Sequence, residues 1–168
     1  MTAFQLAQIN IGRMLGPIDS ETMAGFVAQL GEINALAEGS PGFVWRLKTE
    51  DGDATAIRPY EDERIIVNMS VWDSAAALHR YVYDSAHVEV MRRRREWFSR
   101  MTDAFMVLWW VPAGHRPPVA EAVERLEQLR AHGPTPMAFT FRQQFPPPDA
   151  PFDVLSEPAD LPGECPAL

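Results

Sequence analysis

The 168-residue sequence has little cysteine, few basic residues and no long apolar run, and each shortage excludes a class of protein. The single cysteine, Cys165, excludes a disulfide framework and a cysteine-based metal site. A formal net charge of −8 argues against a nucleic-acid-binding protein, because phosphate contacts need clustered basic residues. No run reaches the about 18 apolar residues of a membrane span, and the first residues do not form a signal peptide. We therefore expect a soluble, cytoplasmic protein that binds neither nucleic acid nor membranes.

Common catalytic motifs are missing as well. The sequence contains no GxGxxG, GxxxxGK[ST] or GxSxG, so nucleotide binding, phosphoryl transfer and serine hydrolysis lack support. The four histidines form no HxH or HxxxH pair, which argues against a non-haem metal site. One axial histidine is enough for haem, so haem binding stays open. We expect no cofactor, with haem as the alternative.

The composition that is present suits one globular domain. Apolar residues make up 46% of the chain and charged residues 23%, which is enough to bury a core. We expect a single domain over residues 1–145. Prolines are frequent from there to the end, so residues 146–168 are expected to form an extended, partly disordered tail.

Hydrophobic periodicity predicts the order strand, helix, strand, strand, helix, strand, with a further helix and a short strand at the end. The expected strands are 4–11, 43–47, 65–72, 104–111 and, at an edge, 139–141. The expected helices lie between Ser20 and Gly39, over 75–83, over 86–100, and between Pro118 and Gly133. This is an α+β chain of the ferredoxin-like type, with an antiparallel sheet and helices on one face, plus an extra C-terminal helix and strand.

The strand over 65–72 carries one apolar face and one mixed face. Ile66, Asn68, Ser70 and Trp72 share the mixed face, because side chains alternate along a strand. A sheet covered by helices on one side exposes its other side, and Ile66 and Trp72 would then need a cover. A second copy related by a two-fold axis supplies one, so we expect a homodimer.

Two stretches of the sequence point to a known superfamily. They are SPGF at 40–43, and VWDS at 71–74 together with Leu78, Tyr81, Ser85 and His87. These residues resemble the dimeric α+β-barrel superfamily, which includes antibiotic-biosynthesis monooxygenases and haem-binding relatives such as chlorite dismutases and aldoxime dehydratases. The resemblance implies homodimers whose sheets pack face to face, with a small-molecule pocket in each subunit between sheet and helices. Several members act on aromatic polyketides with oxygen and no cofactor.

A closer resemblance covers about residues 3–150. It rests on Arg95-x-Trp97-Phe98, on LWWVPAGH at 108–115, and on Gly133-Pro134 with AFTF at 138–141. These motifs are similar to those of a bacterial domain-of-unknown-function family within the same superfamily. This resemblance supports the fold and implies no particular chemistry.

Three residues are candidates for catalysis. His87 stands where the superfamily's motif also has a histidine, and it is either a general base or a residue that satisfies a helix end. Arg95 shares an apolar stripe with Val88 and Phe98, so it either points inward to a ligand oxygen or pairs with an acidic residue. Asn68 either orients a ligand or bonds neighbouring polar groups.

Aromatic residues are candidates for substrate binding. Trp72, Trp97, Trp109 and Trp110 suit a flat apolar ligand, and they equally suit core or dimer packing. Trp109 and Trp110 are adjacent in a strand and must point to opposite faces. Tyr81 is a further hydrogen-bond donor. His115, in the loop VPAGHRPP, is a base at the pocket mouth, a haem ligand, or a residue that bonds the loop backbone.

These residues predict a small-molecule enzyme that acts on an apolar, aromatic or polyketide-like substrate. A cofactor-independent oxygenase, cyclase or isomerase would use His87 to take a proton, while Asn68 or Arg95 stabilises the anion. Two alternatives stay open: a haem-binding enzyme with His115 or His87 as axial ligand, and a non-catalytic dimer that binds an apolar small molecule. The sequence does not decide between an enzyme and a binding protein.

Overall fold

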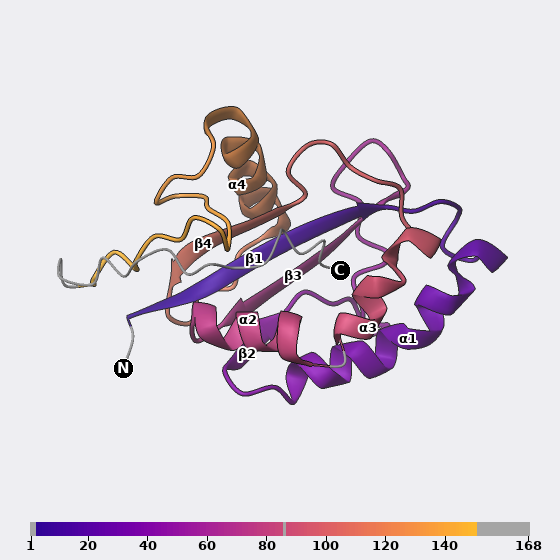
Figure 1. Cartoon of the computed structure of the whole chain (residues 1–168), viewed down its shortest axis with the longest axis horizontal. Coiled ribbons are helices and arrows are strands. Elements are labelled where there is room, and N and C mark those ends of the chain that lie inside the picture. The colour runs from indigo at the N-terminus through magenta and orange to yellow at the C-terminus, as the bar shows by residue number, and fades with distance from the viewer. Residues whose placement is uncertain (1–2, 86, 151–168) are drawn as a thin grey trace.

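The computed structural model describes residues 3–85 and 87–150. Its elements are β1 (Phe4–Arg13), α1 (Glu21–Glu38), β2 (Phe43–Arg46), β3 (Ile65–Trp72), α2 (Ala75–Asp84), α3 (His87–Arg92), β4 (Met106–Pro112) and α4 (Val119–His132). The strands form one antiparallel sheet in the order β2-β3-β1-β4 (Figure 1). This order, with helical crossovers after β1 and β3, is that of the ferredoxin-like fold, and it confirms the predicted fold class.

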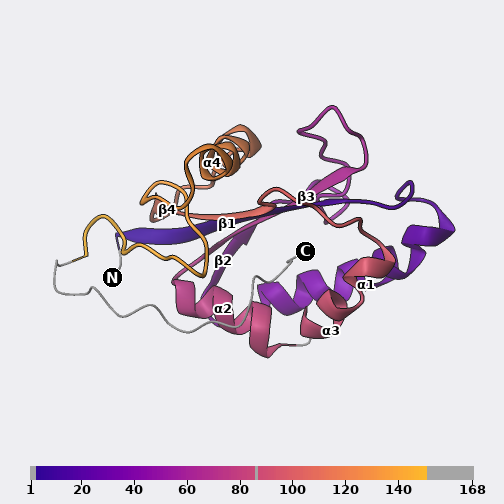
Figure 2. The ribbon, with the colours of Figure 1, turned by 45° about the horizontal axis from the view of Figure 1, so that its top comes forward.

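The sheet has helices on both sides. Figure 2 shows α1, α2 and α3 against one face and α4 against the other. Ala122, Leu126 and Leu129 of α4 pack on the apolar face, where the odd-numbered residues of β1, β3 and β4 gather. The pair α1 and α2–α3 belongs to the ferredoxin-like core, so α4 is the added C-terminal helix.

The expected exposure of the mixed face of β3 is wrong. Ile66 is 3% exposed and Trp72 0% exposed, because this face lies under α1, α2 and α3. The opposite face is also closed: Val71 is 0% exposed in the cluster to which α4 contributes, and Ile57 and Tyr60 of the β2–β3 loop pack on the same cluster. The surface argument for a second copy therefore fails, and the homodimer stays a prediction from the resemblance alone.

Short polar residues set the limits of the two helices that follow β3. Ser74 caps α2, since its Oγ accepts a bond of 3.1 Å from the Ala77 amide. Ser85 follows α2, and its Oγ accepts a bond of 3.2 Å from the His87 amide, which starts α3. Before β2, Gly42 has a φ of +85° and lies so close to α2 that a Cβ would stand 2.4 Å from that of Ala77.

Two other predictions fall short of the structure. The helix expected over 86–100 ends at Arg92 and is followed by a short 3₁₀ helix over Arg94–Glu96. The expected edge strand at 139–141 is reduced to a bridge in which Phe139 and Leu108 exchange two backbone bonds of 2.8 Å. Most of the predicted tail, from residue 151 onward, lies outside the described residues. No helix within the described part of the chain is long and apolar enough to cross a membrane.

Candidate functional site

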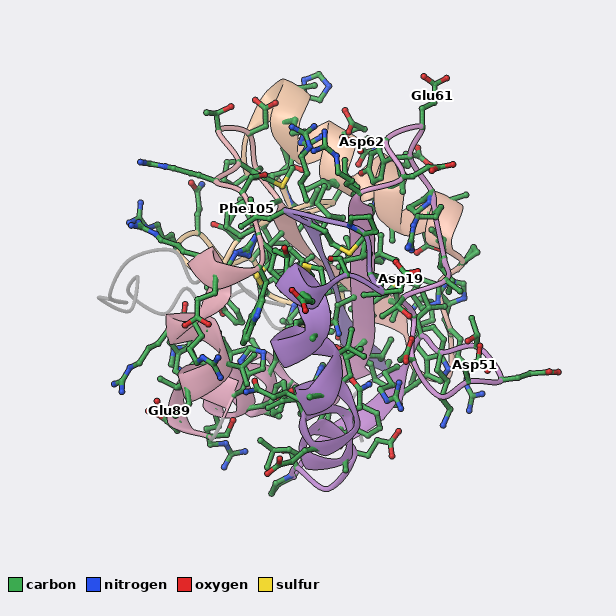
Figure 3. The ribbon with its side chains drawn as sticks, turned by 90° about the vertical axis from the view of Figure 1, so that its right-hand side faces the viewer. Asp19, Asp51, Glu61, Asp62, Glu89 and Phe105 are labelled. Carbon is green, nitrogen blue, oxygen red and sulfur yellow. The ribbon has the colours of Figure 1, made fainter. Side chains whose placement is uncertain are left out.

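A pocket lies between the mixed face of the sheet and the layer of α1, α2 and α3. It consists of an inner and an outer hollow that share Ile33, Asn34, Arg46 and Asn68. The empty space of the inner hollow is about 440 Å³ and that of the outer hollow about 550 Å³, each including its opening to solvent. Figure 3 shows α1 between α3, marked by Glu89, and the β2–β3 loop, marked by Asp51 and Glu61.

Polar side chains of β1 and β3 form the floor of the inner hollow. Gln8 stands opposite Ser70 and Asn10 opposite Asn68, so their side chains meet on one face. Gln8 Nε2 donates to Asn68 Oδ1 at 2.9 Å and to Ser70 Oγ at 2.8 Å, and Trp72 Nε1 donates to the same Ser70 oxygen at 2.8 Å. Asn10 Nδ2 donates to Gln8 Oε1 at 3.0 Å. These bonds fix the orientation of each amide.

One acceptor of this floor has no hydrogen bond from the described residues. Asn10 is 2% exposed, and its Oδ1 has no hydrogen-bond partner among the described residues. Buried carbonyl oxygens normally accept a hydrogen bond, because an unpaired one loses its bonds to water and gains none in exchange. The position of Asn10 in the lining of the inner hollow makes its oxygen a contact point for a ligand that donates a hydrogen bond.

Aromatic rings form a wall above the floor. Trp72 meets Phe43 edge-on, with ring centroids 5.4 Å apart, and stacks on Tyr81 at 5.1 Å. Tyr81 in turn lies 4.9 Å from the ring of His87, which is 2% exposed. Burial raises the pKa of Tyr81, so its hydroxyl stays protonated and can act as a donor. The wall therefore places a titratable imidazole next to neutral aromatic surfaces.

A β-bulge turns an arginine into the pocket. Phe43 pairs with Trp72, but Trp45 pairs with Val71 and Arg46 with Ser70, so the register shifts at Val44. The shift sends Trp45 to the apolar face and Arg46 to the mixed face, an effect typical of bulges. The Arg46 side chain is 10% exposed; Nε donates to Glu38 Oε1 at 2.8 Å and Nη2 to the Gly52 carbonyl at 2.7 Å.

The structure brings four of the predicted site residues together. His87, Asn68, Trp72 and Tyr81 all line the inner hollow. The pocket therefore unites the predicted base, one of the predicted anion-stabilising residues and two of the predicted aromatic contacts. The other predicted residues lie elsewhere.

Arg95 does not point inward, so the position expected from the sequence is wrong. It is exposed, whereas the preceding Arg94 is 8% exposed, with its guanidinium 4.9 Å from the ring centroid of Phe105 and 5.6 Å from that of Phe98. The helical phase that aligned Arg95 with Phe98 breaks after Arg92, because the chain tightens there into a 3₁₀ turn. Arg95 therefore has no access to the pocket.

Trp97 and Trp110 lie on the side of the sheet that carries α1, α2 and α3, and they pack against other side chains outside the pocket lining. Trp97 packs at a centroid distance of 5.9 Å from Phe26, under α1, in a cluster separate from the wall of the inner hollow. Trp110 packs beside Phe139, and its Nε1 donates to the Phe145 carbonyl at 2.8 Å. Trp110 thereby attaches the C-terminal segment to the sheet edge.

Trp109 and His115 belong to the α4 side of the sheet. Trp109 packs in the apolar cluster under α4, which confirms that it and Trp110 point to opposite faces. Its Nε1 donates to Glu121 Oε1 at 2.9 Å, and Glu121 Oε2 lies 2.8 Å from His115 Nε2. His115 is therefore bonded to a carboxylate across the sheet from the pocket, and the prediction that it stands at the pocket mouth is wrong.

The sequence reasoning missed Gln8, Asn10 and Arg46. The two amides carry a readable signal, since they alternate on one face of the strand expected over 4–11. Their partners across β3 depend on strand register, which the sequence does not specify. Arg46 carries no such signal, because plain alternation puts it on the wrong face.

Residues 3–85 and 87–150 contain no group of three or more His, Cys, Asp or Glu side chains placed to hold a metal ion. The functional groups that line the inner hollow are amides, hydroxyls, aromatic rings, one imidazole and one guanidinium.

Comparison with known proteins identifies a family. No curated protein matches the chain. A crystal structure of a variant of SnoaB, a cofactor-independent oxygenase from Streptomyces nogalater, matches with a TM-score of 0.45 and 16% identity, over 68% of this chain and 97% of that one. A protein of unknown function from Nitrosomonas europaea matches with a TM-score of 0.42 and 12% identity, over 69% and 96%. Neither likeness bears on the site. A family profile, by contrast, matches residues 5–154, and the chain belongs to that family, the domain of unknown function DUF3291.

Proposed function

We propose that this chain is a small-molecule enzyme whose pocket binds an apolar, aromatic substrate and moves a proton with His87. One observation carries the proposal: His87 is 2% exposed and lines the same hollow as Asn10, Asn68 and the hydroxyl of Ser70. A buried imidazole beside fixed amides is the combination that proton abstraction and anion stabilisation need.

Each part of the lining has a role in this reaction. The His87 imidazole takes a proton from an acidic C–H or O–H group of the substrate, which leaves an anion with its charge on oxygen. Asn68 lines both hollows, and the floor network uses its Oδ1, so among the described residues its Nδ2 donors remain for that oxygen. The rings of Trp72 and Tyr81 provide flat apolar surfaces for an aromatic substrate.

The proposal involves no organic cofactor or metal. An oxygenase, a cyclase and an isomerase of this kind all begin with this proton transfer, and they differ in the reaction that the anion then undergoes. Comparing conversion in air with conversion under nitrogen separates the first from the other two.

A His87→Gln variant tests the proposal. Hydroxylated aromatic compounds are incubated with the protein in air and under nitrogen, and products are followed by mass spectrometry. We expect the rate to fall about 100-fold or more in His87→Gln, in line with the loss of a general base, and to stay unchanged in His132→Gln, which alters an exposed histidine of α4. Full turnover in His87→Gln overturns the assignment.

Binding without conversion is the second candidate function. The floor amides already bond one another, an arrangement that suits passive recognition as well as catalysis. A ligand that survives purification chemically unchanged, with no product from any compound tried, favours this candidate. The homodimer is a separate proposal, and a native mass of 18.9 kDa contradicts it.

A further inference from the structure

We propose that Arg46 selects ligands with a carboxylate, so that this pocket takes a hydroxylated aromatic acid. The inference deepens the proposed function, since it rests on the same pocket and names the class of molecule that fits it. It assigns Arg46 to binding, with no part in the proton transfer.

Arg46 stands at the middle of the pocket. It pairs with Ser70 across β2 and β3, and Ser70 pairs with Gln8 across β3 and β1, so the three side chains form a row over the floor. Arg46 is also one of the four residues common to both hollows. Arg46 therefore borders a ligand in either hollow.

The protein neutralises the positive charge of Arg46 only in part. The guanidinium of Arg46 has five N–H donors. Its bonds with the described residues leave from Nε, to Glu38, and from Nη2, to Gly52, and Nη1 donates none of them. The Glu38 carboxylate is 41% exposed, so water shares its charge.

The carboxylate among the described lining residues, Asp53, forms no ion pair with Arg46. Its Oδ1 accepts bonds from the amide and the hydroxyl of Thr55, at 2.8 and 2.6 Å. A guanidinium held at 10% exposure with spare donors is suited to the planar carboxylate of a ligand.

A second observation defines the other end of the ligand. The unpaired Asn10 oxygen, on β1, requires a donor such as a hydroxyl. β1 and β2 are separated by β3, so the two contact points belong to strands roughly 10 Å apart. The aromatic wall of Trp72 and Tyr81 borders the same hollow. A flat ring system with a carboxylate at one end and a hydroxyl toward the other matches this pattern.

Calorimetric titration with two probes tests the inference. The probes are 6-hydroxy-2-naphthoate and its methyl ester, which have the same rings and the same hydroxyl at the end opposite the carboxyl group, and differ in charge. We expect the acid to bind the unmodified protein at least tenfold more tightly than the ester. Arg46→Gln should abolish this preference, and Arg95→Gln, which removes an exposed arginine, should preserve it.

A second variant, with the opposite expected effect, distinguishes loss of the Arg46 contact from loss of the fold. Because Arg46 also links α1 to the β2–β3 loop, Arg46→Gln could lose binding simply by unfolding, which its thermal transition would reveal. Glu38→Gln keeps the arginine and removes the competing carboxylate, so we expect it to enlarge the preference for the acid. A preference that is unchanged or smaller in a folded Glu38→Gln protein contradicts the inference.

The failure of this inference differs from the failure of the proposed function. Equal binding of acid and ester overturns the role of Arg46 while the pocket and His87 keep theirs. Binding of neither probe overturns the ligand class in both. A charge-dependent preference together with full turnover in His87→Gln upholds Arg46 and removes the proposed base.

Discussion

Replacing Ser70 by alanine removes the acceptor that two buried donors of the pocket floor share. Ser70 Oγ accepts bonds of 2.8 Å from Gln8 Nε2 and of 2.8 Å from Trp72 Nε1, and Ser70 itself is 6% exposed. The two donors lose unequal amounts. Gln8 Nε2 keeps its bond to Asn68, whereas the described residues offer the Trp72 indole no second acceptor.

The expected loss of stability follows from these contacts. A buried donor left unpaired costs about 1–3 kcal/mol, and an ordinary hydrogen bond contributes about 0.5–1.5 kcal/mol. We therefore expect Ser70→Ala to lower the free energy of unfolding by roughly 2–4 kcal/mol. For a domain of this length that corresponds to about 4–16 °C in Tm.

Urea unfolding of a double-mutant cycle measures the indole's share. Phenylalanine at position 72 keeps a ring without the N–H group, so in a Trp72→Phe background Ser70→Ala should cost only the Gln8 part, about 0.5–1.5 kcal/mol. The coupling energy between the two residues is then about 1–3 kcal/mol. An equal cost in both backgrounds would refute the shared acceptor and, with it, the fixed orientation of the floor amides.

Two further predictions concern the turn before β2 and the pairing of Glu121 with His115. Gly42→Ala forces a Cβ to 2.4 Å from that of Ala77 at a φ of +85°, so we expect a loss above about 2 kcal/mol in urea unfolding, while Gly31→Ala, with nothing within 4 Å, should gain up to about 1 kcal/mol. A Gly42→Ala protein as stable as the parent contradicts the tight turn before β2. Burial raises the pKa of Glu121. Hydrogen bonds, of which the one from His115 has the largest effect, lower this pKa by more, so the net shift is downward. The unfolded chain then takes up this proton first as pH falls, so the stabilisation is complete above the ordinary value of 4.5 and is lost below it. We expect Tm to fall more steeply in that range for the parent than for Glu121→Gln, and parallel curves would contradict the pairing.

The sequence could predict those site residues whose placement depends on local periodicity. Asn68 and Trp72 share a face of an eight-residue strand, and alternation alone places them together. His87 follows a serine that ends one helix and starts the next, so its position at a helix start was also readable. Their joint membership of one pocket required the fold, which the order of strands and helices supplied.

The failures arise where the backbone leaves regular geometry. Arg94 faces inward in place of Arg95, which was expected there. An α-helix turns about 100° per residue and a 3₁₀ helix about 120°, so a change of helix type shifts which side faces inward. Arg46 was missed because one extra residue in β2 reverses the alternation after it. Neither change leaves a mark in hydrophobic periodicity.

The side of the sheet on which α4 packs was equally unreadable from the sequence. Its apolar stripe would fit either face of the sheet, since both faces carry large apolar side chains. Trp109 was expected among the ligand contacts and lies instead beneath this helix. The sequence showed that a C-terminal helix exists, and only the packed structure shows what it covers.

The position of α4 also determines how folding depends on the amount of protein. Where two chains share a core, the folded state follows mass action, and dilution shifts the equilibrium toward unfolded monomers. Here Ala122, Leu126 and Leu129 seal the apolar face of the sheet from within the same chain. The core on this side of the sheet is therefore complete within a single chain. Only the association of chains that have already folded, as in the predicted homodimer, would make stability depend on concentration.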